Sequence, residues 1–482
     1  MIKFNLDKKT KPKVFINIGC LLDVPTSSIV TGKKGETILN GGLGPITAVV
    51  GTGNNFKSTI THFMMLSAAN RVCEATETSI ITYDTEMNMS LDRLEDLASR
   101  FESLPKNPIT GDNPNWTIAD KANIPGNEWA VAVNKYTDEK EADKGSKIDY
   151  EPFKDPYGDK ALNMNIPSFV EIDSMSEFEA KSSMDMLSKD LDSSDTNTFA
   201  MKQGLFKSKF ISTIPTMSVS SNTYFLFTAQ LGEKMDMRTG PAMYSQPFKN
   251  LQYLKNGEHI KGVSPKFFFL IHNAWYAHTA KLLVNDTTKL PEYPLGDDKQ
   301  RTDLNVVTLT QLRGKNGPSG YNIPIVVSQT EGVLPSLSEF HYIKENGRYG
   351  IEGNNIHYHL DLYPDVKLSR TTVRSKINTD PKLRRALNIT AELYQLEVFH
   401  SNYLKNEELL CTPKELYEDI KKLGYNWDEL LETRGYWVIN QYKNKVPFLS
   451  TLDLLRMRKG LYKPYFIKDT KINDNVKKES DK

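Results

Sequence analysis

Between residues 46 and 230, short apolar runs alternate with longer segments of helical character. The apolar runs have the length of strands, and the segments between them have the length of helices. Strands that alternate with helices need crossover connections, which predict a mostly parallel sheet. The predicted strands are 46–50, 79–84, 168–173 and 222–230, and the predicted helices are 58–72 and 89–101.

Two polar stretches interrupt this pattern. Residues 102–165 are rich in Pro, Gly, Asn, Asp and Lys and have little periodicity. Such a stretch predicts a long, partly flexible insertion on the surface. Residues 284–303 predict an extended hairpin tip, and strand character returns at 304–312 and 322–329.

Helical patterns dominate after residue 380, at 381–399, 412–424 and 450–462. We therefore expect an α/β protein with a smaller helical C-terminal region. The expected parts are an N-terminal segment at 1–44, a core at 45–340 that includes the insertion, an extension of the core at 341–402, a small helical or winged-helix module at 403–470, and a disordered charged tail at 471–482. Within the module, the spacing of Trp427, Tyr436 and Trp437 is more typical of a core than of a contact surface.

Composition narrows the class of protein. The 482 residues exceed one compact core, and their 39% apolar content is that of a globular protein. A net charge of +1 gives no overall field toward nucleic acid, so any DNA contact needs local basic patches. The cysteines Cys20, Cys73 and Cys411 are far apart, which argues against a zinc site or disulfides. Without a signal peptide or a membrane span, we expect a cytoplasmic protein with no membrane partner.

The sequence GTGNNFKST at 51–59 follows a predicted buried strand and begins a predicted helix, as a phosphate-binding loop does. Lys57 would reach the terminal phosphates, and Ser58 would ligate Mg²⁺. Phe56 stands where the usual pattern has glycine, so a chance Gly/Asn turn is the alternative for the isolated match. The loop residues are Gly51, Thr52, Gly53, Asn54, Asn55, Phe56, Lys57, Ser58 and Thr59.

Three further polar residues lie at or near predicted strand ends, where an open parallel sheet gathers its active site. Glu86 is placed to act as a general base on the attacking water, and Asp173 to hold Mg²⁺ directly or through water. Gln230 ends its strand, where its amide would sense the terminal phosphate. An ordinary cap or turn residue is the alternative for each acid taken alone.

Together these residues resemble the RecA/UvsX recombinases, in particular the phage UvsX branch, which also has phenylalanine before the loop lysine. YDTE at 83–86 is similar to the strand of that family that ends in the catalytic glutamate. EIDSMSEFE at 171–179 and TAQLGEKMDM at 228–237 are similar to its second acidic motif and its sensor strand. The resemblance implies a RecA-like P-loop ATPase core that uses ATP and Mg²⁺, in the cytoplasm of an infected bacterium. It also implies that KGVSPKFFF at 261–269 is a returning strand.

The resemblance assigns nucleotide contacts outside the loop as well. LTQLRGKNGPSG at 309–320 is similar to a strand-edge basic pair that reaches the ATP of a neighbouring subunit, with Arg313 and Lys315 at the matching positions. Arg93 replaces the tyrosine that stacks on adenine, and its guanidinium would stack instead. The alternative for the basic pair is a solvated turn.

The resemblance implies two DNA-binding loops, near 189–201 and 232–261. Positive charge interleaved with aromatic rings suits single-stranded DNA, and the second loop combines the two. Its candidates are Lys234, Arg238, Tyr244, Phe248, Lys249, Tyr253, Lys255 and Lys261. The alternative is a surface loop that packs its aromatics inward. A second basic cluster at 367–376 is either a duplex-contacting face or a charged helix surface.

The first hypothesis is therefore a DNA-dependent ATPase that binds single-stranded DNA and promotes homologous pairing and strand exchange in recombination, repair and recombination-dependent replication. Its partners would be single-stranded DNA, further copies of itself in a filament or ring with ATP between subunits, and a recombination mediator or single-strand-binding protein. A hexameric RecA-fold helicase would use the same site. A regulatory RecA-like ATPase that binds a protein through the same loops is the alternative without DNA.

Overall fold

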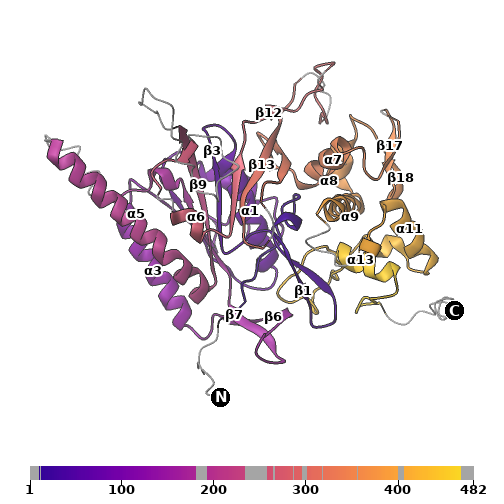
Figure 1. Ribbon diagram of the computed structural model, residues 1–482, viewed down its shortest axis with the longest axis horizontal. Coiled ribbons are helices and arrows are strands. Elements are labelled where there is room, and N and C mark those ends of the chain that lie inside the picture. The colour runs from indigo at the N-terminus through magenta and orange to yellow at the C-terminus, as the bar shows by residue number, and fades with distance from the viewer. Residues whose placement is uncertain are drawn as a thin grey trace, which may run out of the picture.

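The computed structural model describes residue 10 and residues 12–180, 193–233, 258–263, 266–285, 287–295, 301–316, 319–354, 356–399 and 407–467. They form a mixed α/β structure in which helices flank a large, mostly parallel sheet (Figure 1). Among these residues, no helix is long and apolar enough to cross a membrane.

The described residues place eleven strands in the central sheet. The six strands from β11 to β5 are parallel, and β13, β14 and β15 extend the sheet beyond β11, each antiparallel to the strand before it. From one edge to the other the strands are β15 (Gly332–Val333), β14 (Asn322–Ser328), β13 (Leu304–Gly314), β11 (Asn273–Ala277), β3 (Ile46–Gly51), β9 (Thr223–Glu233), β8 (Ser168–Asp173), β4 (Ile80–Asp84) and β5 (Trp116–Asp120), with β10 (Glu258–Ile260) beside β9 and β12 (Lys281–Leu282) beside β13.

Both faces of the sheet carry a hydrophobic core, because the parallel strands are apolar on both sides. In β3, Ile46, Ala48 and Val50 belong to one core and Val49 to the other. One face is covered by α1 (Lys57–Cys73), α2 (Leu91–Ala98), α7 (Pro335–Glu345) and α9 (Pro381–Val398). The other is covered by α3 (Gly126–Ala142), α5 (Ser193–Ser221) and α6 (Lys266–Leu270), of which α3 and α5 lie side by side at the left of Figure 1.

The insertion expected at 102–165 is built of regular elements. It supplies the edge strand β5, the helix α3 and a hairpin of β6 (Lys147–Lys154) and β7 (Ala161–Asn165). Trp129 and Val133 of α3 are buried in the core that α5 also covers. The exposed face of α3 carries most of its charged residues, and this charge concealed the helical period of the buried positions.

The N-terminal segment and the C-terminal module pack together. The segment contains η1 (Val24–Thr26) and a hairpin of β1 (Ser28–Thr31) and β2 (Thr37–Asn40). Trp437 is buried, its Nε1 donates to Phe15 O over 3.2 Å, and its ring lies 4.9 Å from that of Phe153. The expectation of a core is therefore confirmed for Trp427 and Trp437, which are at most 5% exposed, whereas Tyr436 is only partly buried.

The remaining C-terminal part is small and mostly helical. In its described residues 407–467, the one β pairing is an isolated bridge between Arg434 and Phe448, so no wing of paired strands is present there. Besides α9, the described elements from 351 onward are β16 (Ile351–Gly353), β17 (Tyr358–Leu360), β18 (Tyr363–Leu368), α8 (Val373–Thr379), η4 (Glu407–Leu409), α11 (Pro413–Lys422), α12 (Trp427–Leu430) and α13 (Thr451–Arg458).

The prediction of a returning strand at 261–269 is wrong. Residues Lys266–Leu270 form α6, and the strand that returns beside β3 is β11. The run of three phenylalanines led to this error, because a short apolar run fits a buried helix turn as well as a strand. The polar stretch at 284–303 carries a bridge between Val284 and Pro291, as a hairpin tip would.

Candidate active site

The site is built at the carboxyl edge of the parallel strands, around the end of β3. The next strand of this sheet along the chain, β4, lies on one side of β3, and β11 lies on the other side. β3 is therefore next to a topological switch point, where the order of the strands reverses. The register aligns Gly51 with Gln230 and Asp84 with Asp173. Residues that are far apart in sequence therefore meet at one edge.

The loop between β3 and α1 takes backbone conformations that glycine usually supplies. Asn54 has a φ of 58° and Phe56 a φ of 55°, and Phe56 caps the start of α1. The Phe56 ring packs, partly buried, against the neighbouring core. A Cβ on Gly51 would lie 2.7 Å from Ala277 O, so Gly51 must lack a side chain. Nothing lies within 4 Å of a Cβ built on Gly53, so the loop is open there.

Lys57 points back across the loop. Its Nζ donates to Thr52 O over 2.6 Å. Burial lowers the pKa of Lys57, while the charges of Asp173 and Glu86 act to raise it. Asn55, which is 4% exposed, fixes the loop shape by donating to Thr52 Oγ1 over 2.8 Å and to Ala277 O over 3.2 Å.

Asp173 ends β8 next to the first turn of α1. Its carboxylate accepts hydrogen bonds from the hydroxyls of Ser58 and Thr228. Burial and the charge of Glu171 raise the pKa of Asp173. A carboxylate and a hydroxyl are ligands that Mg²⁺ accepts beside phosphate oxygens and water, so this pair fits the ion. In the described part of the chain, no group of three or more His, Cys, Asp or Glu side chains forms a metal site.

Glu86 lies exposed on the loop after β4, opposite Gln230. Gln230 Nε2 donates to Glu86 Oε1 over 3.2 Å, and Asn88 Nδ2 donates to Glu86 Oε2 over 3.3 Å. The loop that presents Glu86 is shaped by Asp84, whose carboxylate accepts the backbone N–H groups of residues 86, 87 and 89 over 2.8–3.0 Å. Lys57, Ser58, Glu86, Asp173 and Gln230 are thus brought to one place.

Four residues that support this site were not singled out from the sequence: Asn55 for its side chain, Asp84, Thr85 and Thr228. Thr85 N donates to Asp173 O over 2.8 Å, and Thr85 Oγ1 accepts from Ser174 N over 2.6 Å. These contacts tie the end of β4 to the end of β8. The DT pair before Glu86 was the available signal, because Asp and Thr commonly bond to backbone just after a strand.

A buried ion pair lies beneath the site. His62 Nε2 on α1 lies 3.3 Å from Glu171 Oε2 on β8, and Thr82 also donates to Glu171 over 3.1 Å. Burial opposes the charged form of His62, but Glu171 outweighs it and the pKa of His62 is raised. The pair joins the helix that carries Ser58 to the strand that carries Asp173.

An apolar cavity of about 220 Å³ opens beside Thr59 at the start of α1. Phe63, Leu97 and Phe101 contribute apolar walls, and Gly332 closes one side. Arg93 does not line this cavity. Its guanidinium donates to Thr330 O and, over 3.0 Å, to Gln329 O, and so ties α2 to the end of β14.

The structure does not bring Arg313 and Lys315 to the loop at 51–59 of their own chain. Arg313 lies opposite Ala274, which is level with Ala48, three residues before Gly51. Three residues of strand span about 10 Å. Lys315 follows the end of β13 at the amino-terminal edge of the parallel strands, where its N–H donates to His272 O over 3.1 Å.

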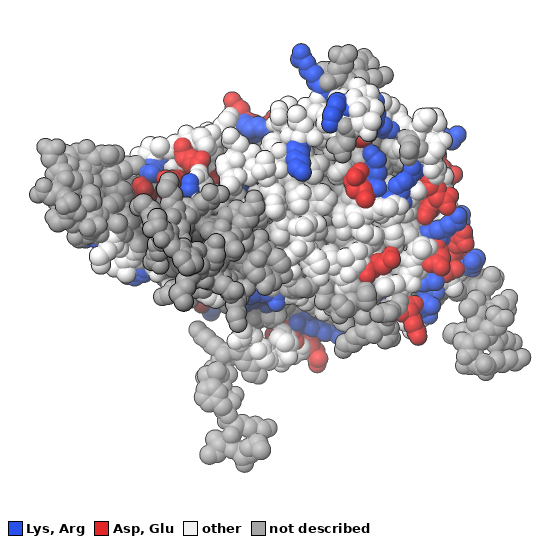
Figure 2. Space-filling view, turned by 45° about the horizontal axis from the view of Figure 1, so that its top comes forward, with Lys and Arg blue, Asp and Glu red and all other residues white. Residues whose placement is uncertain are grey.

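Most of the expected DNA contacts lie outside the described residues: Lys234, Arg238, Tyr244, Phe248, Lys249, Tyr253 and Lys255. Lys261 is described and exposed, and its N–H donates to Gln230 O over 2.9 Å. In the basic cluster at 367–376, Arg374 is buried and pairs with Asp303 and Glu331. Basic and acidic side chains intermingle at the right of Figure 2, which is typical of a charged structural surface.

No protein-family model matches the chain, and no curated protein matches it.

Proposed function

We propose that this chain is an ATP hydrolase with a RecA-like P-loop core, which couples hydrolysis to single-stranded DNA in homologous recombination. The observation that carries the proposal is the meeting of Lys57 and Ser58 with Asp173, Glu86 and Gln230 at one strand edge. Phosphoryl transfer asks a protein mainly for positioning and for stabilisation of negative charge. This set of residues supplies both.

The residues take distinct roles in the proposed reaction. The N–H groups of the loop and of the first turn of α1 hold the phosphates, and Lys57 leaves Thr52 O to meet the terminal phosphate. Glu86 orients the attacking water and takes its proton. Ser58 and Asp173 would hold Mg²⁺, which neutralises phosphate charge when bound. The apolar cavity beside Thr59 has room for the adenine base of ATP.

The path of the chain supports coupling to DNA. Most of the candidate DNA contacts lie in sequence between Glu233, the last residue of β9, and Glu258, the first residue of β10, and β10 pairs with β9 beside Gln230. Gln230 in turn contacts Glu86. A ligand held by that segment would therefore act next to the proposed base.

The test is ATP turnover with and without single-stranded DNA. The wild-type chain should hydrolyse ATP with Mg²⁺, and DNA should raise the rate. Lys57→Ala should abolish turnover, while the exposed control Lys135→Ala should leave it unchanged. A wild-type chain without turnover would overturn the proposal. Closed six-membered rings in electron micrographs with ATP analogue and DNA would favour the helicase over a filament.

A further inference from the structure

A polar cavity of about 320 Å³ adjoins the apolar cavity beside Thr59. Phe63 and Phe101 contribute to the walls of both cavities. The other walls of the polar cavity come from the N-terminal segment, α1, α7, α9 and the C-terminal module. Residues as distant in sequence as Gly19 and Tyr436 therefore face the same space, which is large enough for a small metabolite.

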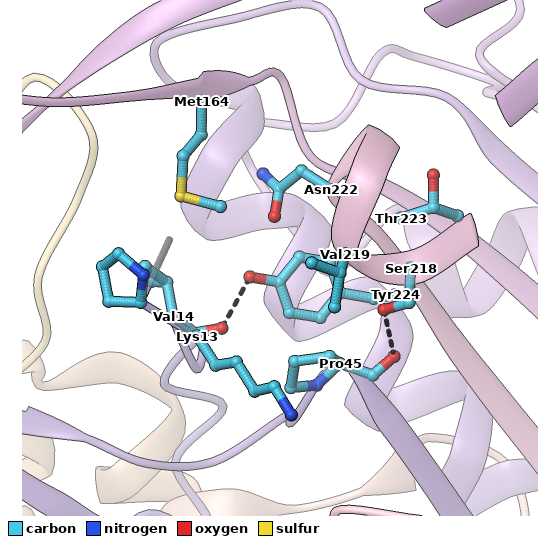
Figure 3. Close-up of a pocket in the computed structure, with 10 residues that line it drawn as sticks. Lys13, Val14, Pro45, Met164, Ser218, Val219, Asn222, Thr223 and Tyr224 are labelled. Carbon is cyan, nitrogen blue, oxygen red and sulfur yellow. Dashed lines mark hydrogen bonds between the residues drawn. The ribbon is translucent and has the colours of Figure 1, made fainter. Parts of the chain in front are cut away.

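The N-terminal wall of the polar cavity is held by contacts on both sides of a sharp bend. Before the bend, Tyr224 Oη donates to Val14 O over 2.8 Å, as Figure 3 shows. At the bend, the Asp23 carboxylate accepts the N–H groups of Ile18 and Gly19 over 2.7 and 2.9 Å. These contacts fix the backbone of the segment where it lines the cavity.

The C-terminal wall is held by Arg434, which is 5% exposed. Its guanidinium donates to Val446 O over 2.8 Å and to Tyr436 O over 2.6 Å. Both walls therefore keep their shape through contacts within the chain. A ligand that enters a preformed cavity loses less binding free energy to the ordering of the protein.

Two arginines that line the polar cavity have no acidic partner. The guanidinium of Arg71 lies over the ring of Tyr436, 3.3 Å from the ring centre, and makes no hydrogen bond or ion pair with the described residues. Arg384 donates to Ile377 O and Asn378 O over 2.9 and 3.1 Å, and it too has no ion pair in the described part of the chain. The Nε of Arg71 is buried, and a buried donor without a partner is destabilising.

The acidic residues of the cavity do not offset these charges. Burial raises the pKa of Asp23 to about 7 and the pKa of Glu339 to about 8. Burial also raises the pKa of Glu392. Near pH 7 such groups spend much of the time protonated and uncharged, whereas an arginine keeps its charge. The positive charges of Arg71 and Arg384 therefore dominate the polar cavity.

An oxyanion that also carries hydroxyl groups matches this lining. Guanidinium groups form their strongest hydrogen bonds with phosphate or carboxylate. The buried Glu339 accepts a hydrogen bond from Asn388 Nδ2 over 3.3 Å, and a carboxyl group has acceptor capacity beyond one such bond. We propose that the polar cavity binds a small hydroxylated oxyanion, a polyol phosphate or a hydroxycarboxylate, whose charged group is held by Arg71 and Arg384.

This site is separate from the proposed ATP site and does not depend on the proposed function. Its ligand contacts the N-terminal segment, α1, α9 and the C-terminal module together, and these parts meet only in the folded chain. A ligand that binds the folded chain alone stabilises it. Binding should therefore raise the melting temperature as well as release or absorb heat.

The test is calorimetry on the full-length chain with glycerol phosphate, citrate, inorganic phosphate and glycerol. Either glycerol phosphate or citrate should bind about tenfold or more tightly than inorganic phosphate, because hydroxyl contacts add to the charged ones. Glycerol, which has no charge, should not bind. Preference for glycerol phosphate identifies a polyol phosphate site, and preference for citrate identifies a hydroxycarboxylate site.

Variants locate the binding. Arg71→Met keeps an extended side chain over Tyr436 but removes the charge, so it should weaken binding about tenfold or more. The matched control Arg301→Met, at an exposed arginine outside the cavity, should bind as the wild-type chain does. Arg384 is exposed, so Arg384→Met provides the same test if Arg71→Met does not fold.

Two outcomes overturn the inference. If neither glycerol phosphate nor citrate binds the wild-type chain, the polar cavity holds only water. If binding is lost in Lys57→Ala but kept in Arg71→Met and Arg384→Met, the anion occupies the loop at 51–59 instead. None of these titrations contains ATP, so a chain that fails to hydrolyse ATP still tests the polar cavity.

Discussion

Gln230 Nε2 donates a hydrogen bond to Glu86 Oε1 over 3.2 Å, although 144 positions separate the two residues in the sequence. The contact joins β9, at the position level with the end of β3, to the loop after β4 across the intervening strand β8. Glu86 thereby has a fixed position at the mouth of the site even though its side chain is exposed. The proposed base and the proposed sensor thus touch each other directly.

Replacing Glu86 with Gln tests the assignment of the base. The amide keeps the shape of the side chain but cannot take a proton, so we expect ATP to bind and to remain uncleaved. Loss of a general base typically lowers the rate about 10²- to 10⁴-fold. Single-turnover hydrolysis measures the rate, and a fluorescent ATP analogue measures binding. Turnover equal to that of the exposed control Glu102→Gln would refute the assignment.

Replacing Phe56 tests the backbone of the loop. Its φ of 55° costs a non-glycine residue about 1–2 kcal/mol and suits a β-branched residue least. Phe56→Gly and Phe56→Val both lose the ring that packs against the core, so their difference reports the backbone. We expect the free energy of unfolding in urea to be lower for Phe56→Val than for Phe56→Gly by about 1 kcal/mol or more. We also expect Phe56→Val to hydrolyse ATP more slowly than Phe56→Gly. Equal stabilities would contradict this.

Replacing Asp173 with Asn separates function from stability. The raised pKa of Asp173 means that the folded chain holds its proton more tightly than the unfolded chain does. Folding is therefore penalised above the folded pKa, and the penalty shrinks as pH falls through it. We expect the uncharged variant to lose turnover yet to melt at the same temperature or higher at pH 7.5 without Mg²⁺. A clearly lower melting temperature of Asp173→Asn would contradict the claim that the charged carboxylate destabilises the fold.

Lys140 gives a pH dependence of stability. It is partly buried, donates to Ser168 Oγ over 2.6 Å, and burial lowers its pKa to about 7 from 10.5. Between these values the unfolded chain binds more protons, so the free energy of unfolding rises with pH, by at most about 1.4 kcal/mol per pH unit. Lys140→Met should flatten this rise in urea unfolding from pH 7 to 10. The exposed Lys135→Met should keep the rise of the free energy of unfolding with pH. If Lys140→Met also keeps the wild-type slope, Lys140 is not the source of this pH dependence.

Trp437 tests whether the C-terminal module is integral to the fold. Its ring is buried against Phe153, and its Nε1 bonds to Phe15 O. Trp437→Ala should lower the free energy of unfolding by about 3–5 kcal/mol, as other buried tryptophans do. Trp437→Phe keeps much of the ring but loses the hydrogen bond, so a smaller loss is expected. A single unfolding transition in both would show that the module unfolds with the core.

Much of the central sheet follows from periodicity. The four strands predicted between 46 and 230 correspond to β3, β4, β8 and β9, with ends shifted by a few residues. They are nearly continuous apolar runs, the pattern of parallel strands buried on both faces. The edge strand β5 escaped prediction because four of its five residues are at least partly exposed, so it lacks such a run.

The main residues of the candidate site could be predicted from the sequence, but the contacts that hold them in place could not. Lys57, Ser58, Glu86, Asp173 and Gln230 each follow or end an apolar strand, so sequence order alone places them at one edge. The contacts of Thr85 and Thr228 depend on which strands are neighbours, and sequence order does not give the order of strands in a sheet. The burial of Arg374 likewise depends on partners 43 and 71 residues away.

The pairing of the hairpin of β1 and β2 with Asp453 has a consequence for biosynthesis. Thr37 N donates to both carboxylate oxygens of Asp453, 416 positions later, over 3.0 and 2.9 Å. While the ribosome is still translating, the N-terminal hairpin has no Asp453 to bind and Phe15 O has no Trp437. The hairpin can therefore make this contact only after the 416 further positions up to Asp453 have been synthesised. Such late closure favours assistance by a chaperone during synthesis.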